Sequence, residues 1–251
     1  MGTTTLNTQG LVLHTTNYSE TSVVAKIFTR QLGERSYLVK GVRGGRSKAK
    51  RNLLQPMSYL EMTVYDNRRA QLQYIKEMQP ARPMNGCATN SVKTALLFFM
   101  NEVLYKTVRE EEPNPCLFDF LVGQMETLDQ TDEPLGDFPV MFLLRLALYL
   151  GIEPLDNYSR MEPLFQMREG RFLAPPQVVH ADPGNLDYYL AYDDSLCLHS
   201  YLDSLRNGIP RPLLPSAIRR QMTSIMLQYY AIHLPGFKEI RSIEVLHQIL
   251  A

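Results

Sequence analysis

The chain has 251 residues, of which 45% are hydrophobic and 21% are charged, and this composition excludes disordered and collagen-like proteins. Its 26 Lys and Arg residues balance 26 Asp and Glu residues, so an even spread of charge would argue against nucleic-acid binding. The charge is not evenly spread, because residues 1–80 hold 12 bases and five acids and residues 81–251 hold the compensating excess of acids. A net charge of +7 followed by −7 predicts two regions with different partners.

The first 80 residues have the alternating hydrophobicity and the turn residues of β-strands. We expect strands near residues 11–14, 23–30, 37–42, 59–65 and 72–75. Gly33 can adopt the positive φ of a tight turn after the second strand. Five short strands without helical periodicity predict a small closed barrel. An OB-fold is the natural candidate, although another five-stranded barrel has the same pattern.

From residue 81 the hydrophobic spacing becomes helical. We expect helices near residues 92–104, 117–125, 137–150, 186–205, 215–234 and 242–250. Asn90 or Ser91 is the expected N-cap of the first helix, and Gly151 is the expected end of the third, whose apolar residues surround it as in a core helix. Residues 152–183 are irregular. The predicted fold is α+β, with a basic barrel over 1–80 and an acidic helical domain over 81–251.

The most informative stretch is residues 40–51, which contains six bases, three glycines and no acid. The bases are Lys40, Arg43, Arg46, Lys48, Lys50 and Arg51. Positive donors on a backbone that can approach closely are what phosphate binding needs. The alternative is a solvated connection between strands. The glycine spacing fits neither an ATP-binding loop nor a dinucleotide fingerprint.

Six aromatic residues are interleaved with these charges in the first 80 residues. They are Tyr18, Phe28, Tyr37, Tyr59, Tyr65 and Tyr74. Aromatic rings on a barrel face can stack nucleic-acid bases. We expect most of them to fill the barrel interior and one or two at most to stack.

No pattern indicates a metal, a cofactor or a catalytic residue. The three cysteines form no CxxC pair, and the five histidines form no zinc-binding spacing. The carboxylate runs at 110–112 and 193–194 are typical of solvated helix ends. Few cysteines, no secretory signal and no apolar stretch long enough to span a membrane predict a cytoplasmic protein. Because no catalytic pattern is present, we expect that it is not an enzyme.

The acidic helical region carries a basic minority close to leucines and an isoleucine. Its members are Arg206, Arg211, Arg219 and Arg220. Such a cluster can receive an acidic peptide with an apolar end. Ordinary surface charges near helix ends are the alternative.

Several short motifs, in order along nearly the whole chain, resemble those of the bacterial recombination mediator RecO family. They are Gly10-Leu11-Val12-Leu13, Tyr18-Ser19-Glu20-Thr21-Ser22, Lys40-Gly41-Val42-Arg43, Leu54-Gln55-Pro56 and His233-Leu234-Pro235-Gly236-Phe237-Lys238. The resemblance implies an N-terminal OB-fold and a helical domain. It also implies a DNA repair and recombination protein, nucleoid-associated in the cytoplasm, that binds single- and double-stranded DNA and anneals complementary strands.

The same resemblance implies partners and site residues. With RecR, the family helps to load RecA onto DNA coated with single-stranded-DNA-binding protein. Lys40 and Arg43 match the family's basic motif, and the other bases of residues 40–51, together with Arg30 and Arg35, extend the expected DNA-binding set. The arginines of the helical region are the expected site for the tail of single-stranded-DNA-binding protein.

One departure from the family concerns zinc. Many members carry a four-cysteine zinc site in the irregular segment, but residues 155–179 contain no cysteine. We therefore expect a zinc-free variant, in which Tyr158, Leu164, Phe165 and Phe172 replace the metal by apolar packing. A different class of function also fits the sequence: an RNA-binding OB-fold module with a helical protein-interaction domain.

Overall fold

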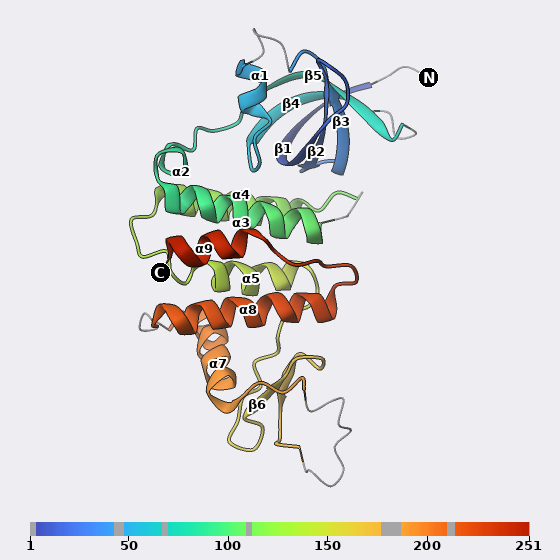
Figure 1. Cartoon of the computed structure of the whole chain (residues 1–251). Helices are drawn as coiled ribbons and strands as arrows, with labels where there is room; N and C mark the ends of the chain where they lie inside the picture. Colours follow the sequence, from blue (N-terminus) through green and yellow to red (C-terminus); the bar gives the residue numbers. More distant parts are fainter. Residues whose placement is uncertain are drawn as a thin grey trace. The chain divides into compact units, whose positions relative to one another are not determined.

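The structure is a computed structural model that describes residues 4–42, 48–66, 70–108, 112–176, 187–209 and 214–250. The chain divides into two compact units, Met1–Asp132 and Glu133–Ala251, and each is described by itself (Figure 1). The last barrel strand ends at Pro80, whereas the first unit continues into helices. The predicted domain boundary at residue 80 therefore stays a prediction.

The first unit begins with a closed five-stranded barrel, as the sequence predicts. Its strands are β1 (Thr4–Asn17), β2 (Val23–Thr29), β3 (Gly33–Val39), β4 (Tyr59–Asp66) and β5 (Leu72–Pro80). Their order around the barrel is β1-β2-β3-β5-β4, and β3 and β5 are parallel neighbours (Figure 1). Gly33 has a φ of +69° in the turn between β2 and β3, which confirms its expected role.

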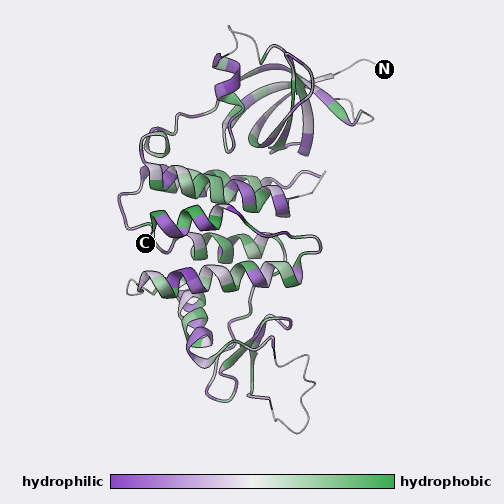
Figure 2. Cartoon of the chain, in the orientation of Figure 1, coloured by the Kyte–Doolittle hydropathy of each residue, from purple (hydrophilic) through white to green (hydrophobic). Residues whose placement is uncertain are grey.

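The barrel core is built mainly by alternate residues of the strands, and Figure 2 shows hydrophilic and hydrophobic positions mixed along them. The buried members are Val12, Val23, Ala25, Ile27, Tyr37, Val39, Val42, Leu54, Leu60, Met62 and Val64. Strand β1 is longer than expected because it pairs with β4 over residues 4–11 and with β2 over residues 10–17. Its first half is polar, so it has no hydrophobic alternation that would predict a strand.

A short helix begins near the end of the basic stretch, where we expect no helix. Helix α1 (Lys48–Leu53) has no buried residue, and this explains why no apolar periodicity predicts it. The chain re-enters the core directly after it, at Leu54, which is 4% exposed. The helix is thereby held at the barrel wall while its lysines and arginine stay exposed.

Helices α2 (Asn85–Thr89), α3 (Ser91–Thr107) and α4 (Pro115–Gln130) complete the first unit. The expected N-cap of α3 is confirmed: the Asn90 Oδ1 accepts hydrogen bonds from the backbone N–H groups of Val92 and Lys93, at 2.9 and 3.2 Å. Phe118 of α4 packs against Phe28 and Tyr59 of the barrel. These contacts make the barrel and the three helices one compact unit.

The second unit is mainly helical. It contains α5 (Phe138–Tyr149), α7 (Tyr192–Asn207), α8 (Ser216–His233), α9 (Ser242–Ile249) and a small hairpin of β6 (Leu164–Gln166) and β7 (Arg171–Leu173). Helix α5 is buried around most of its circumference, as expected for a core helix, and Gly151 follows it with a φ of +70°. The Tyr230 hydroxyl of α8 donates a hydrogen bond to the Leu143 carbonyl of α5, at 2.7 Å.

The expected start of the fourth predicted helix, near residue 186, is wrong. Helix α7 begins at Tyr192, because residues 188–190 run alongside β6 instead. The backbone N–H of Met167 donates to the Tyr188 carbonyl at 2.8 Å, and the N–H of Leu190 donates to the Phe165 carbonyl at 2.9 Å. These hydrogen bonds override the local helical spacing of the sequence.

Candidate nucleic-acid interface

The basic stretch begins where β3 leaves the barrel. Gly41 follows with a φ of +71°, and the buried Val42 donates its N–H to the Thr21 carbonyl at 2.9 Å. Lys40 is exposed, and its ammonium lies 5.8 Å from the centre of the Tyr74 ring, within the range of a cation–π contact. The start of the basic stretch is therefore fixed against the barrel, next to an aromatic residue of β5.

A groove of about 540 Å³ lies between the end of β3, strand β5 and helix α1. Its lining includes Leu38, Val39, Lys40, Lys50, Leu53, Tyr65, Tyr74, Ile75, Lys76, Glu77 and Met78. We call it the basic groove, because its three lysines outnumber its one carboxylate. In such a groove the lysine ammonium groups can bind phosphates, and an exposed tyrosine ring can stack a base.

Two more of the basic residues predicted to bind DNA lie on α1, beside the groove. Lys48 and Arg51 are exposed, and α1 has no acidic residue. With Lys40 and Lys50, four of the predicted DNA-binding residues thus come from one side of the barrel. Arg43 and Arg46 lie outside the described residues, so their place in the set stays a prediction.

Arg30 is engaged in an ion pair instead of lining the groove. Its Nε and Nη2 donate to both carboxylate oxygens of Asp119 on α4, each at 2.8 Å. This pair raises the pKa of Arg30 and lowers that of Asp119, in each case chiefly through the side-chain hydrogen bonds. Arg30 lies at the turn before β3, and Lys40 lies beyond the other end of that strand. The structure therefore does not bring the two together.

Arg35 is on β3, half-buried, and its Nη1 donates to the Glu34 carbonyl at 3.1 Å. Five residues of extended strand separate it from Lys40 by about 16 Å. Arg35 therefore lies apart from the groove, and its role in DNA binding stays a prediction.

Lys76 is the groove residue that the sequence analysis missed as a site residue. It lies on β5 next to an irregularity in the β4–β5 register, between Ile75, which pairs with Val64, and Glu77, which pairs with Thr63. Its positive charge was the only signal in the sequence. The register that brings it beside Tyr74 and opposite α1 is not readable from spacing alone.

The prediction that most of the six aromatic residues fill the barrel interior is wrong, because only Tyr37 belongs to the barrel core and Phe28 is buried against Phe118 of α4. Phe28 and Tyr37 are completely buried, and burial raises the pKa of Tyr37 above its ordinary value. Tyr59 packs on α4, and Tyr18 is 63% exposed in the turn after β1. Tyr74, with 47% of its surface exposed, and its neighbour Tyr65 remain beside the lysines of the groove.

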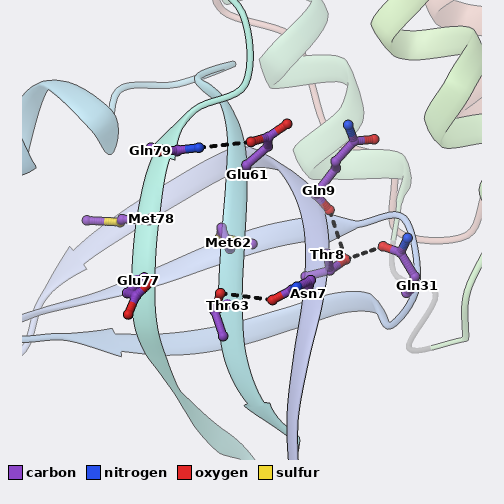
Figure 3. Close-up of a pocket in the computed structure, with 10 residues that line it drawn as sticks. All are labelled: Asn7, Thr8, Gln9, Gln31, Glu61, Met62, Thr63, Glu77, Met78 and Gln79. Carbon is purple, nitrogen blue, oxygen red and sulfur yellow. Dashed lines mark hydrogen bonds between the residues drawn. The ribbon is translucent and has the colours of Figure 1, made fainter.

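A second hollow of about 480 Å³ lies on strands β1, β4 and β5, and its side chains are amides, hydroxyls, carboxylates and methionines (Figure 3). Glu61 and Glu77 supply its charge, and the Gln79 amide donates to Glu61 at 3.0 Å. The Thr63 hydroxyl donates to the Asn7 side chain at 2.9 Å. Two carboxylates repel phosphates, so this face is a poor site for a DNA backbone.

The predicted arginines of the helical region do not form one cluster. Arg206, at the end of α7, lines a hollow of about 640 Å³ together with Arg145 and the apolar side chains of Leu148 and Leu155. Arg145 is exposed, and partial desolvation by the surrounding side chains lowers the pKa of its guanidinium. The structure thus provides an arginine that the sequence analysis did not select, since it is embedded in an apolar helix.

Arg219 and Arg220 belong instead to α8 and line a small hollow together with residues of α9. The Arg219 guanidinium occupies the space beside Gly136, and the Nη1 of Arg220 donates to the His247 carbonyl at 3.4 Å. Burial, and secondarily the charge of Arg220, lower the pKa of His247. Arg211 lies outside the described residues.

The segment that we expect to be zinc-free is held by aromatic and amide contacts. Phe172 is completely buried and contacts Phe165 and Tyr158 edge-on, with ring centres 5.1 and 5.5 Å apart. The Asn157 side chain donates to the Phe172 carbonyl and accepts from its N–H, both at 2.9 Å. These residues offer no thiolate, so the segment does not fit a four-cysteine zinc site.

Metal-binding groups and membrane-spanning helices were considered among the residues that the structure describes. No group of three or more His, Cys, Asp or Glu side chains within those ranges is placed to hold a metal ion. None of the helices in the same part of the chain combines the length and the apolar character that a bilayer span requires.

A closed five-stranded barrel with a basic, aromatic groove, followed by a helical region, defines an OB-fold protein with an appended helical part. Residues 1–84 match the family described as recombination protein O N terminal, and residues 88–157 match recombination protein O C terminal. The chain belongs to the RecO family. This membership places it among proteins of DNA repair and recombination.

Curated relatives match nearly the whole length of the chain. A DNA repair protein RecO of Phocaeicola vulgatus is 30% identical over 97% of this chain and 98% of its own. Proteins of the same name from Christiangramia forsetii and Flavobacterium psychrophilum are 27% and 28% identical, over 97–98% of this chain and 98–99% of theirs. The similarity therefore includes both compact units.

Proposed function

We propose that this chain is a non-enzymatic mediator of DNA repair and recombination. In this proposal it binds single- and double-stranded DNA, anneals complementary strands and, with RecR, helps to load RecA onto DNA coated with single-stranded-DNA-binding protein. The observation that carries the proposal is the basic groove beside α1, on the barrel of a RecO family member.

The groove suits annealing because its lysines would bind the phosphates of DNA and not the edges of its bases. Lys40, Lys50 and Lys76 are flexible point charges, and contacts to the backbone carry no sequence information. A strand held by its phosphates keeps most of its base edges free to find a complement. Several such contacts give affinity that salt weakens.

A strand-annealing assay on DNA coated with single-stranded-DNA-binding protein tests the proposal. The wild-type protein is expected to accelerate annealing, and Arg43→Ala/Arg46→Ala/Lys48→Ala/Lys50→Ala is expected to slow it at least about tenfold, because phosphate contacts are lost. Unchanged annealing by this variant contradicts the proposal.

Two controls separate the alternatives. Incubating the DNA with the protein and Mg²⁺ or Mn²⁺ should leave it uncut, since we propose no nuclease activity. A competition between RNA and DNA strands of matched sequence should not favour RNA. A strong preference for RNA identifies the chain as an RNA-binding module instead.

For the second unit, we propose that the hollow lined by Arg145 and Arg206 receives the acidic tail of single-stranded-DNA-binding protein. Leu148 and Leu155, which are 57% and 51% exposed, supply apolar surface for the end of such a tail. The two guanidinium groups supply charge for its carboxylates. The hollow also contains Glu153 and Asp156, and the Asp156 carboxylate lies 2.8 Å from His199.

Titration with a peptide of that tail should give saturable binding that salt weakens. Arg206→Ala should reduce the affinity about fivefold, the effect of about 1 kcal/mol for one partly exposed charged contact. Arg160→Ala removes an exposed arginine elsewhere in the same unit and should change little. The absence of binding, or equal losses in the two variants, contradicts this site.

A further inference from the structure

Two tyrosines stand side by side on the outer face of the barrel, at one end of the basic groove. Tyr65 of β4 and Tyr74 of β5 are direct partners in the strand register. The next pair, Val64 and Ile75, packs with the barrel core, so the two tyrosine side chains point outward. Tyr74 is 47% exposed, and its ring is therefore accessible from the groove.

The strand arrangement opens the groove beside this ring. The parallel pairing of β3 with β5 ends at Leu38 and Tyr74. Beyond this pair β5 continues to Pro80, while β3 ends at Val39 and the chain continues into the basic stretch. The groove therefore begins where the ladder stops, and Tyr74 lies at that point.

Positive charge surrounds the ring. The Lys40 ammonium is 5.8 Å from the ring centre, Lys76 follows two residues later on the same strand, and Lys50 faces the groove from α1. Glu77 is the one acidic residue in the groove lining. An exposed ring flanked by lysines matches a nucleotide, whose base stacks while its phosphates contact the ammonium groups.

Whether the DNA is single- or double-stranded decides whether one of its bases can reach this ring. Bases in a duplex are stacked between their neighbours, and extruding one costs a few kcal/mol. Bases of a single strand are exposed and can stack on an aromatic side chain irrespective of sequence. Phosphates, in contrast, are accessible in both forms.

We propose that Tyr74, flanked by Lys40 and Lys76, is a stacking subsite for one unpaired base. This inference rests on the proposed DNA binding and deepens it: the lysines hold either form of DNA, and Tyr74 adds affinity for the single strand alone. Pairing with a complement removes the base from the ring. The annealed product is then held by phosphate contacts only, which favours its release.

The test compares Tyr74→Ala, Tyr74→Phe and Tyr18→Ala, the last of which removes an exposed tyrosine in the turn after β1. Affinities are measured for a labelled oligothymidine, for its duplex with oligoadenine, and for an oligonucleotide of the same length that lacks bases. Circular dichroism and the thermal transition confirm that each variant is folded.

Tyr74→Ala should weaken oligothymidine binding by about 5- to 150-fold, the effect of losing one base–aromatic stack, and duplex binding by less than about twofold. Tyr74→Phe and Tyr18→Ala should bind like the wild type. The wild type should bind the base-free strand less tightly than oligothymidine, and Tyr74→Ala should not distinguish them.

Two results overturn the subsite. Unchanged oligothymidine binding by Tyr74→Ala means that no base stacks there, and equal losses for strand and duplex mean that the ring only positions Lys40. Either result leaves the proposed function standing if the wild type binds DNA in a salt-dependent manner. A wild type that binds neither form of DNA rejects the proposed function itself.

Discussion

Replacing the three lysines of the basic groove, as Lys40→Gln/Lys50→Gln/Lys76→Gln, is expected to weaken single-strand binding by about 100-fold near 0.1 M salt. Each phosphate contact to a single strand contributes about 0.7 to the slope of log K against log salt, and three contacts contribute about two log units over the tenfold range from 0.1 to 1 M. Duplex binding should fall at least as much. Fluorescence anisotropy with labelled oligonucleotides measures both.

A control variant with the same loss of charge distinguishes the effect of contacts in the groove on DNA affinity from the effect of the protein's overall electrostatic field. Lys26, Arg82 and Lys106 lie in the same unit and form ion pairs with Glu34, Glu126 and Glu102, respectively. Their triple replacement by Gln should change the affinity by no more than about threefold. Equal losses in the two triple variants contradict the assignment of the groove.

Removing the Phe172 ring is expected to have the largest effect on stability. Phe172→Ala should lower the free energy of unfolding by about 3–5 kcal/mol, because a completely buried aromatic side chain leaves a cavity between Phe165, Tyr158 and His199. Denaturation by urea, followed by circular dichroism, measures this loss.

Met161→Ala is the matched control, since Met161 lies in the same segment and is 78% exposed. It should change the free energy of unfolding by no more than about 0.5 kcal/mol. A chelator should leave the wild-type transition in place, because contacts of Phe172 and Asn157 hold this segment. A transition that falls with a chelator, or a Phe172→Ala protein as stable as the control, contradicts this description.

The barrel and most helices could be predicted because their signals are local. Alternating apolar residues mark β2–β5, and Asn90 marks the start of α3. Two of the elements that were not expected lack such signals: α1 buries no residue, and the first half of β1 is polar. Helix α2 and the hairpin of β6 and β7 were not expected either, and they are only five and three residues long. The start of α7 was placed too early because pairing of residues 188–190 with β6 depends on a distant segment.

The candidate site could be predicted only in part, for the same reason. The run of positive charge in the sequence predicts Lys40 and the basic residues of α1 as site residues, and the fold leaves them exposed on one side of the barrel. Charge did not reveal that Arg30 is paired with Asp119, 89 residues away in sequence. Nor could it show that the β4–β5 register and the end of the β3–β5 ladder bring Lys76 and Tyr74 to the groove.

The net charge of zero therefore conceals the uneven distribution of charge on which the proposed DNA binding depends. The excess of acids after residue 80 cancels the excess of bases before it. Within the barrel, Lys40, Lys50 and Lys76 line the basic groove, whereas Glu61 lines the polar hollow on β1, β4 and β5, and Glu77 lines both (Figure 3). Charge is thus unevenly distributed both along the chain and around the barrel.

The salt dependence of single-strand affinity shows whether the basic groove holds DNA phosphates, as we propose. With three to six phosphate contacts, log K of the wild type should fall with log salt at a slope of about −2 to −4. The slope of the Lys40→Gln/Lys50→Gln/Lys76→Gln variant should be shallower by about two. A wild-type slope near zero, or the same slope in both proteins, would contradict this proposal.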